Sequence, residues 1–522
     1  MSFSPAHLTT LTNCDREPIH APGGIQPHGF LLLLDTPALT IAGTSTNVRD
    51  LFWREAQALI GTPVAELLGL PVGDSLTRAR GRPEFTRQAQ FIGHATLNTA
   101  GEAQVYSLVA HGLGDLIVLE GEPAPKLAPL QGEQELQTFL TRLAEAESLH
   151  ELQQMAVAEV RRITGFDRCL LYRFDADWNG TVIAEDGNGA LPSYLHHHFP
   201  AADIPRPARE LYRRNRLRLI PTHAYRPVSI IGSAKLPSVH SLDLSLSVLR
   251  SVSPIHLEYM RNMGTGSSMS ISLLRGGELW GLISCHSRDP RFIPLATRTA
   301  CDLVGQFLSL QLAAREQTQE LAFRVELTTV LTRLLSDVAR SWDFGDAEVG
   351  ADLMRLARAE GVAIVTADAV VRHGRTPDEG LVRSLADWVR QSGRDLVASD
   401  RLGQDFPPAA EAGAEASGLL AVDTAPAGLS LLWFRPELVQ VVEWGGEPVK
   451  DLAGAGGGRE LHPRRSFDTW RETVRGRVQP FEAAVIASVK ELRRALAALS
   501  AAPRAQPAAT KRAASKVRPR RS

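Results

Sequence analysis

Residues 268–286 read Ser-Met-Ser-Ile-Ser-Leu-Leu, then Arg-Gly-Gly-Glu, then Leu-Trp-Gly-Leu-Ile-Ser-Cys-His. Two apolar runs that flank a Gly-Gly turn predict an antiparallel hairpin. Because side chains alternate along a strand, Ser268, Ser270 and Ser272 share one face, while Met269 and Ile271 lie on the other. The serine face is either solvated or holds part of a ligand, and the pattern alone leaves both readings open.

The chain before this hairpin predicts the rest of an α/β domain. Apolar residues at helical spacing cover 135–164, and strand-like runs follow at 169–174 and 181–185. A segment from about 186 to 256 is rich in His, Pro and Arg and is predicted to be a long irregular insertion.

Two further domains are predicted around it. Short apolar runs from about 30 to 120, with one helical stretch near 47–59, indicate a small antiparallel-sheet domain before a Pro-rich linker at 121–134. Residues 296–340 carry apolar residues at helical spacing and predict a long connector helix. A third domain follows, with strands near 361–367 and 428–434 and a helix near 380–392.

The C-terminal region has two parts. Apolar residues between 481 and 499 recur every three or four positions, which fits a dimer helix or a helix docked on its own domain equally well. The segment 504–522 holds seven Lys or Arg residues and no acid, and we expect a disordered, solvated tail.

Composition excludes several classes of protein. The 522 residues contain 57 Lys and Arg against 58 Asp and Glu, which argues against a protein that works mainly by coating nucleic acid. Four cysteines cannot form a disulfide framework, and the longest apolar runs are strand-sized. No signal peptide is visible at the N-terminus. We therefore expect a cytoplasmic, multidomain protein with no membrane partner.

The cysteines differ in their surroundings. Cys14 lies on an irregular, Pro-flanked segment where a thiol could meet an electrophile, although a free thiol in a flexible terminus is the simpler interpretation. Cys169 and Cys285 fall in apolar strands and Cys301 in a helix, so these three are predicted to be inert core residues.

The arginines of the insertion suggest an anionic ligand. Arg218 and Arg250 stand among many Arg and His residues, and a guanidinium offers paired donors to a carboxylate. The three consecutive histidines His196, His197 and His198 are a poor metal site and are predicted to form a solvent-exposed loop. No phosphate-binding loop, serine-hydrolase elbow or zinc-protease motif is present. From the residues alone, the chain is a binding module with an anionic pocket.

Seven motifs in order resemble the bacteriophytochrome family. They are the stretch from Cys14 through EPIHAPGGIQPHG, FPAADIPRPARELY, SVLRSVSPIHLEYMRNMG, SMSIS, LWGLISCH, WGGEP at 444–448 and HPRRSF at 462–467. The resemblance implies an α/β (α+β) chain of three tandem antiparallel-sheet sensor domains joined by a long connector helix. It places an N-terminal segment at 1–25, a PAS domain at 26–120, a GAF domain at 130–312 and a PHY domain at 313–503. The PHY hairpin extension, or tongue, would span about 438–475.

The resemblance further implies a covalent biliverdin IXα chromophore attached to Cys14 by a thioether. Ile255 stands where plant and cyanobacterial relatives carry a GAF cysteine, so attachment there is not expected. The remaining chromophore contacts implied by the motifs are Tyr172, Phe199, Asp203, Ile204, Pro205, Tyr212, Arg218, Arg250, His256, Tyr259, Ser268, Ser270 and His286. In this scheme Arg218 and Arg250 pair with one propionate and the serines with the other, while His286 contacts the D-ring carbonyl.

Function follows from the same resemblance. Red light would isomerise the C15=C16 bond of the bilin, and the tongue would then exchange an Arg464–Asp203 contact for one made by Ser466. No phosphoacceptor histidine motif or ATP lid is found, so we expect no enzyme activity in this chain. It would be either a photosensory fragment or a short form that signals through a partner or a kinase in trans, as a homodimer. The alternative is a GAF-type sensor of a small anionic metabolite, such as a cyclic nucleotide, without photochemistry.

Overall fold

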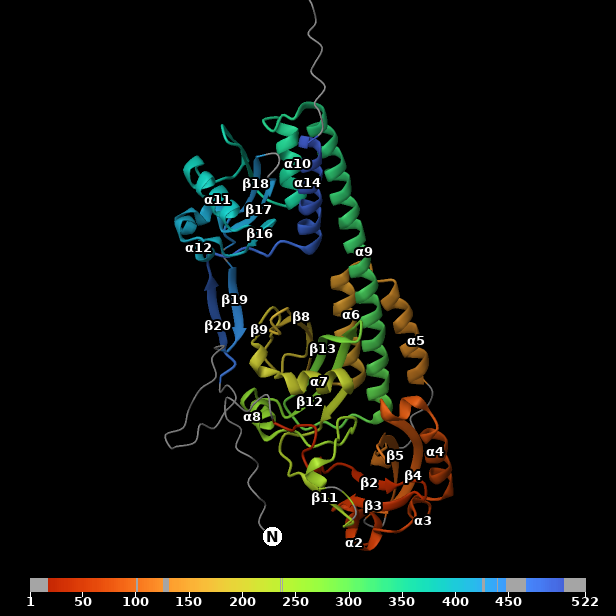
Figure 1. Ribbon diagram of the computed structural model, residues 1–522. Coiled ribbons are helices and arrows are strands. Elements are labelled where there is room, and N and C mark those ends of the chain that lie inside the picture. Colours follow the sequence, from red (N-terminus) through yellow and green to blue (C-terminus); the bar gives the residue numbers. More distant parts are fainter. Residues whose placement is uncertain are drawn as a thin grey trace, which may run out of the picture. The chain divides into compact units, whose positions relative to one another are not determined.

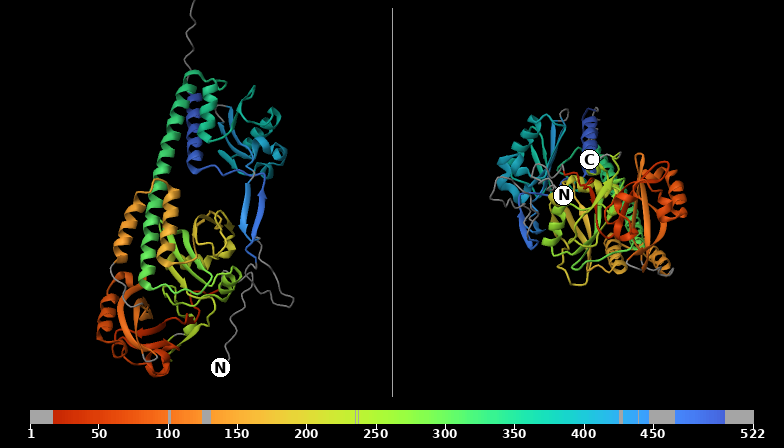
Figure 2. Two further views of the ribbon diagram at one scale, coloured as in Figure 1. Left: turned by 180° about the vertical axis from the view of Figure 1, so that it is seen from behind. Right: turned by 90° about the horizontal axis from the view of Figure 1, so that it is seen from below.

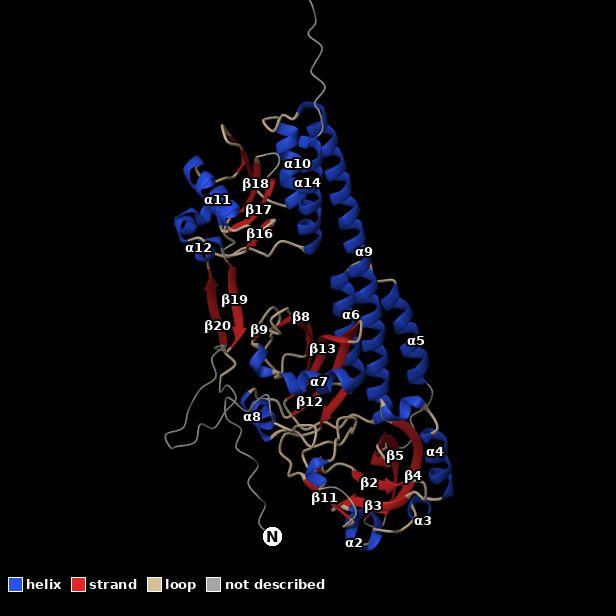
Figure 3. Ribbon diagram, viewed as in Figure 1, coloured by secondary structure: helices blue, strands red, loops and turns tan. Residues whose placement is uncertain are grey.

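The computed structural model describes residues 17–99, 102–124, 131–234, 236, 238–424, 428–438, 440–446 and 466–501. Three sheets, antiparallel except for one parallel pair in the second, and a long helix dominate it (Figures 1 and 3). The chain divides into two compact units, one of residues 1–316 with 442–472 and one of residues 317–441 with 473–522. Among the described helices, none is long and apolar enough to cross a membrane.

The first sheet has seven strands in the order β1-β11-β3-β2-β6-β5-β4. Its strands are β1 (Gly24–Ile25), β2 (Phe30–Asp35), β3 (Thr40–Ser45), β4 (Gln90–Thr99), β5 (Glu102–Leu113), β6 (Leu116–Pro123) and β11 (Val228–Gly232). Helices α1 (Val48–Phe52), α2 (Ala56–Leu59), α3 (Val64–Leu68) and α4 (Leu70–Arg80) pack against it around a core that includes Phe30, Leu32 and Leu76.

Two expectations about this region need correction. The helical stretch near 47–59 is two short helices, because Trp53 adopts a left-handed conformation with φ 55° and ends the first. The segment 186–256 is not irregular throughout: it contains a helix, and β11 within it pairs with β3 of the first sheet. Periodicity could not reveal that pairing, since it joins strands far apart in the sequence.

The second sheet has the order β10-β12-β13-β7-β8-β9-β19-β20. Its strands are β7 (Arg168–Phe174), β8 (Gly180–Gly187), β9 (His198–Phe199), β10 (Leu217–Ile220), β12 (Ser267–Arg275), β13 (Glu278–Ser287), β19 (Gln440–Gly445) and β20 (Thr469–Val474). The predicted hairpin is confirmed: β12 pairs with β13, and both turn glycines, Gly276 and Gly277, have positive φ.

One face of this sheet is covered by helices. The helices α5 (Gln131–Ala144) and α6 (Leu149–Thr164) run beside the first part of α9 (Leu295–Ser341), as Figures 1 and 2 both show. Met269 and Ile271 point into this core, as predicted, together with Cys169, Cys285 and Cys301. The three thiols are buried and free, which confirms them as core residues, and burial raises the pKa of the Cys285 and Cys301 thiols.

The second unit contains the third sheet, in the order β15-β14-β18-β17-β16. The strands are β14 (Gly361–Val365), β15 (Val370–Gly374), β16 (Leu396–Ser399), β17 (Gly418–Thr424) and β18 (Leu429–Arg435). Helix α10 (Ala347–Ala357), the C-terminal part of α9 and α14 (Ala483–Ala501) share one core with it, while α11 (Glu379–Gln391), α12 (Leu402–Asp405) and α13 (Gly413–Ala416) pack in another. Val485, Val489 and Leu492 are fully buried, so α14 is docked on its own domain.

Candidate functional site

The second face of the second sheet borders two adjoining cavities. One has about 1270 Å³ of space not filled by atoms, its mouth included, and the other about 710 Å³. Ser268 and Ser270 of β12 form part of both walls, so the polar alternation of that strand faces a hollow rather than bulk solvent. The opposite walls come from α7 (Arg206–Arg214) and α8 (Pro254–Asn262).

The two cavities bring together every predicted chromophore contact among the described residues. The larger is lined by Asp203, Ile204, Pro205, Tyr212, Arg218, Arg250, His256, Tyr259, Ser268 and Ser270. The smaller adds Tyr172, Phe199 and His286. Cys14 lies outside the described residues, but Glu17, three positions later, lines the larger cavity and accepts a hydrogen bond from the Ser253 hydroxyl at 3.2 Å.

Two buried arginines define one end of the larger cavity. Arg218 Nη2 donates to the carbonyl oxygen of Arg250 at 2.5 Å, and Arg250 Nη1 donates to the carbonyl of Ser245 at 3.2 Å. Arg218 Nη1 is buried with no hydrogen-bond partner, and among the described residues neither guanidinium forms an ion pair. Burial, and then the neighbouring Arg218, lower the pKa of Arg250 to about 9. Two desolvated cations with a spare donor favour an anionic ligand.

His256 is neutral in this surrounding. Its ring stacks on Tyr259 with centroids 6.0 Å apart and planes 8° from parallel. Burial, and then the charge of Arg218, lower the pKa of His256 to about 4. A neutral imidazole offers one donor and one acceptor to a ligand in the cavity.

A second arginine contact orients His286 at the other end. Arg168 Nη2 lies 3.2 Å from His286 Nδ1, and a guanidinium can only donate, so Nδ1 must accept and the ring proton sits on Nε2. Nε2 lies 3.1 Å from the Ser284 hydroxyl on the cavity wall. Burial, and then Arg168, hold the pKa of His286 well below its usual value. The Nε2–H of His286 therefore donates to the Ser284 hydroxyl at the cavity wall.

Aromatic side chains close the smaller cavity. Tyr172 packs on Phe199 with ring centroids 6.0 Å apart, and Tyr194 packs on Phe199 at 5.5 Å. A Cβ atom at Gly180 would lie 1.7 Å from Cζ of Tyr172, so only glycine allows this ring position. Tyr259 donates to the Asp203 carboxylate at 3.2 Å, between the two cavities.

Strands β19 and β20 extend the sheet beside these walls. Trp444 pairs with His198, and Phe467 packs edge-on against Tyr259 at 4.9 Å. Arg464 lies outside the described residues. Ser466 is described, and its hydroxyl donates to Asp468 at 2.9 Å.

The histidine triplet is not the solvent-exposed loop that we predicted. His197 is 9% exposed, and its Nε2 lies 2.9 Å from the hydroxyl of Thr469 on β20. His198 packs against the Trp444 ring at 5.9 Å. The triplet holds the added strands because a parallel β9–β19 pairing brings distant residues beside it, which composition could not indicate. Only His196 is exposed.

Comparisons with known proteins agree with this geometry. Models of the PAS fold, the GAF domain and the phytochrome region match residues 14–124, 148–315 and 327–504. A bacteriophytochrome of Xanthomonas campestris pv. campestris is 34% identical, over 93% of this chain and 79% of that protein. The chain belongs to the bacteriophytochrome family. Phytochromes are a family of light receptors, and the three domains are those of their photosensory core.

Solved structures and other curated relatives extend the likeness. A crystal structure of a bacteriophytochrome from R. palustris has a TM-score of 0.79 and 37% identity, covering 94% of this chain and 99% of that one. The Stigmatella aurantiaca phytochrome photosensory core module gives 0.78 and 39%, with the same coverage. Cyanobacterial phytochrome B of Nostoc is 36% identical, and this bacteriophytochrome chain spans 66% of its length.

Several wall residues were missed from the sequence. Tyr194 and Ser284 line the smaller cavity, and Arg168 reaches His286 although no motif argument singled it out. Ser284 could have been found, because it lies two positions before His286 and so shares its face of β13. Arg168 gave no signal, since most arginines are surface residues and this one is 2% exposed.

Proposed function

We propose that this bacteriophytochrome is a red/far-red photoreceptor that binds biliverdin IXα covalently through Cys14. The observation that carries the proposal is the apolar, aromatic-walled hollow with two buried arginines at one end, whose Arg218 Nη1 has no partner. A linear tetrapyrrole with two propionates matches that combination of walls and charge. The bound bilin would supply red absorption and isomerisation of its C15=C16 bond.

The chain's own residues would hold the ligand at three places. Arg250 and Arg218 would bind one carboxylate, where the spare guanidinium donor lies, and the hydroxyls of Ser268 and Ser270 would receive the other. His286, with its proton on Nε2, would donate to a carbonyl at the far end.

The remaining contacts would surround the rings. The backbone carbonyl of Asp203 would accept from pyrrole N–H groups, with His256 close to the same region. Ile204, Pro205 and Tyr212 would supply apolar wall, and Tyr172, Phe199 and Tyr259 would cage the terminal ring.

Attachment at Cys14 is supported by two positions. Residue 255, where a GAF thiol would be needed, is Ile, and it lines the larger cavity. Glu17 lines the same cavity, so the thiol of Cys14 is three residues, or about 10 Å of extended chain, from a wall position. Addition of the thiol across a vinyl group would form the C–S bond and place the proton on the neighbouring carbon.

Signalling would pass through the tongue. Trp444 pairs with His198 of β9, and the Thr469 hydroxyl contacts His197. A Cβ atom at Gly445 would lie 2.6 Å from the Phe199 ring, so β19 packs directly against an aromatic residue of the cavity wall. Movement of that wall would change the tongue's contacts, and exchange of Arg464 for Ser466 at Asp203 would report it.

Dimerisation would use α9. Leu303, Leu310, Leu321 and Val325 are 45–70% exposed, and at 100° per residue they fall on one face of the helix. We propose a homodimer through this stripe, with a kinase or other regulator as the signalling partner and no nucleic acid involved. We further propose that the protein acts in the cytoplasm and that residues 504–522 form a solvated tail. The proposed domain limits are 1–25, 26–120, 130–312 and 313–503.

The first experiment is an absorption spectrum of the purified chain with biliverdin, in the dark and after red and far-red light. A reversible red/far-red difference is expected, with a zinc-fluorescent band on a denaturing gel. Cys14→Ala is expected to lose that band and keep reversible binding. A colourless, unchanged protein would reject the photoreceptor and favour a sensor of a small anionic metabolite.

A further inference from the structure

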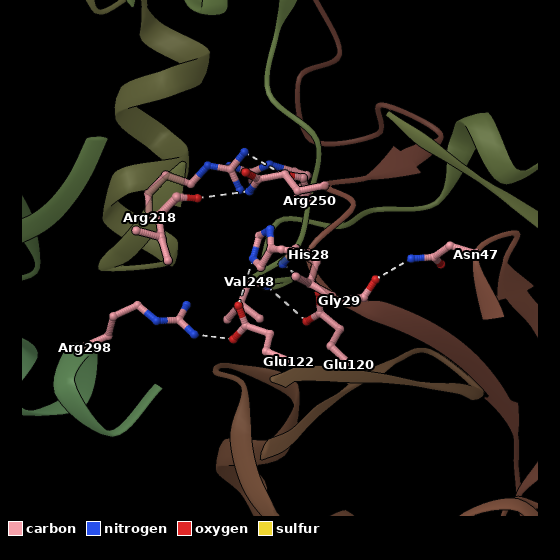
Figure 4. Close-up of polar contacts among 12 residues, drawn as sticks. His28, Gly29, Asn47, Glu120, Glu122, Arg218, Val248, Arg250 and Arg298 are labelled. Carbon is pink, nitrogen blue, oxygen red and sulfur yellow. Dashed lines mark hydrogen bonds and ion pairs between the residues drawn. The ribbon is translucent and has the colours of Figure 1, made fainter. Parts of the chain in front are cut away.

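Glu120 is a fully buried carboxylate outside the cavities. It lies on β6 of the first sheet, and its side chain reaches a loop that belongs to the GAF region. Oε2 accepts from the amide of Val248 at 3.0 Å and Oε1 accepts from the amide of Leu249 at 2.8 Å (Figure 4). Both oxygens are thus used to fix two successive peptide groups of one loop.

The same loop, residues 248–250, also forms backbone contacts with Ile25 and Gln26 near the N-terminus. The carbonyl of Leu249 accepts from the amide of Gln26 at 2.8 Å, and Ile25 forms an isolated bridge with Arg250. Gln26 Nε2 also donates to Leu219 on β10 at 3.0 Å. The backbone of residues 248–250 is thus bound by Glu120 on one side and by Ile25 and Gln26 on the other.

Arg250 is the point where the loop meets the anion end of the cavity. The carbonyl oxygen of Arg250 accepts a hydrogen bond from Arg218 Nη2. The position of this one peptide group therefore determines where both guanidinium groups lie. A shift of the Val248–Leu249 peptide would move the Arg250 backbone and with it the acceptor that orients Arg218.

We propose that Glu120 is a positioning residue of the anion pocket: by binding the amides of Val248 and Leu249 it holds Arg250 and Arg218 where a ligand carboxylate would bind. The inference rests on the proposed function for the nature of the ligand. It adds a residue of the PAS domain, outside both cavities, to the determinants of chromophore binding.

The chemistry requires a group with two acceptors. Two adjacent N–H donors converge on the side chain, and a carboxylate can accept both. A glutamine of the same shape would turn its amide donor toward one of them, leaving a buried N–H without a partner. Above its pKa of about 8 the Glu120 carboxyl is ionised, and its field then opposes the lowering of the pKa of Arg218 and Arg250.

Glu122 provides a matched control two residues along the same strand. It too is buried, but it accepts from Arg298 on α9 and lies 3.0 Å from His28 Nε2. Figure 4 shows the two carboxylates side by side with these separate partners. Glu122→Gln therefore removes a buried charge from the same sheet without touching the amides of Val248 and Leu249.

The first test needs no chromophore. Amide hydrogen exchange is measured in the apoprotein for wild type, Glu120→Gln and Glu122→Gln at about pH 9, above the pKa of about 8 of Glu120, so that the wild-type side chain is the carboxylate. Glu120→Gln is expected to raise exchange at Val248 and Leu249 about tenfold or more over wild type, whereas Glu122→Gln leaves these two amides within about threefold. Unchanged exchange in Glu120→Gln would overturn the proposal.

The second test separates positioning from general damage. Reversible affinity is measured in the Cys14→Ala background for biliverdin and for its dimethyl ester, which lacks propionate charge. Glu120→Gln is expected to weaken biliverdin about tenfold and the ester less than threefold. An equal loss for both ligands would overturn the proposal, and if Glu120→Gln does not fold, Glu120→Asp, which keeps the carboxyl group on a shorter side chain, is measured instead with the same expected outcomes. Failure of the wild type to bind either bilin would reject the proposed function, while the exchange result would still decide the role of Glu120.

Discussion

The second and third sheets are both largely antiparallel and both carry helices, yet one borders a cavity and the other is packed on both faces. In the third sheet, Ala363, Val365 and Phe434 pack against α11, and Val362, Ile364 and Trp433 pack on the opposite face. In the second sheet one face is covered by helices in this way, and the other carries a smaller apolar cluster that includes Leu170 and Leu282. This other face also presents Ser268, Ser270, Ser284 and His286 to the cavities.

The difference shows how a sensor sheet is hollowed. Small hydroxyl side chains replace apolar ones at alternate positions, and arginines are buried where an all-apolar face would have excluded them. The packed face still supplies the hydrophobic core. Residues on the cavity face make fewer packing contacts with the rest of the protein. Substitutions there should therefore reduce ligand affinity more than they reduce the free energy of unfolding of the free protein.

The largest expected effect is on the filled sheet. Trp433 is fully buried and its indole N–H donates to the carbonyl of Leu353 at 2.8 Å. Trp433→Ala should destabilise the second unit by about 3–5 kcal/mol, because the cavity it leaves has rigid walls. Calorimetric or urea unfolding of the apoprotein measures the loss.

The matched change in the hollow sheet is Tyr212→Ala. Tyr212 lines both cavities, so part of its surface has no protein partner to lose. A cost of about 1 kcal/mol is expected. Equal losses for the two aromatic substitutions would break the comparison.

Next in size is the removal of a cavity arginine. Arg250→Met should weaken biliverdin binding at least tenfold, since a charge-assisted hydrogen bond to a carboxylate contributes about 1.5–3 kcal/mol. The apoprotein should keep or gain stability, because a poorly paired buried charge is removed. Ligand titration and thermal unfolding of the same preparation test both halves, and a large loss of apoprotein stability would contradict the idea that this face is built for a ligand.

A smaller effect concerns pH. Burial raises the pKa of Glu120 to about 8. The hydrogen bonds from the amides of Leu249 and Val248 lower this pKa, the charge of Glu122 raises it, and the charge of Arg298 lowers it. Arg218 and Arg250 are also close enough to interact with the carboxyl group. The folded chain thus keeps a proton that the unfolded chain has released above about pH 4.5.

Stability should therefore fall as pH rises from 6.5 to 8, by at most about 1.4 kcal/mol per pH unit. His111 and His256, whose pKa burial lowers to about 4, change stability in the opposite sense while the unfolded chain loses their protons around pH 6.5, so the full slope is expected only in the upper part of this range. Unfolding of the apoprotein at several pH values should show the slope in wild type and lose it in Glu120→Gln. An identical slope in both would assign the titration to another group.

The smallest effect is the proton position of His286. Arg168 donates to Nδ1 and also contacts the Tyr194 ring at 4.2 Å. Arg168→Lys replaces the planar guanidinium by a single ammonium group that is not held in the same direction, so the fraction of His286 in the Nε2–H tautomer should fall. Nitrogen NMR of the imidazole in the apoprotein measures the ratio, and a wild-type ring protonated on Nδ1 would contradict the assignment.

Prediction succeeded where local pattern decides structure. The hairpin at 268–286, the helix at 295–341 and the buried cysteines follow from alternation, helical spacing and apolar context, which depend on neighbours in the sequence. The three domains, and the thirteen expected residues that line the two cavities, were named only because seven motifs resemble one family.

What failed depends on contacts between distant residues. The His196–His198 triplet was assigned to solvent because nothing nearby reveals that β19 pairs with β9. The insertion was expected to be irregular because β11 finds its partner in another domain's sheet.

By itself, the sequence determined the order of the elements, the polar face of β12 and the chemistry available to the pocket, since these are properties of residue type and spacing. Only the tertiary structure decided that Arg168 would orient His286, that Arg218 would keep a spare buried donor, and that Glu120 would reach the loop before Arg250. The physical reason is that each of these depends on burial and on hydrogen-bond partners brought from far along the chain, and the free energy of a buried polar group is set by those partners.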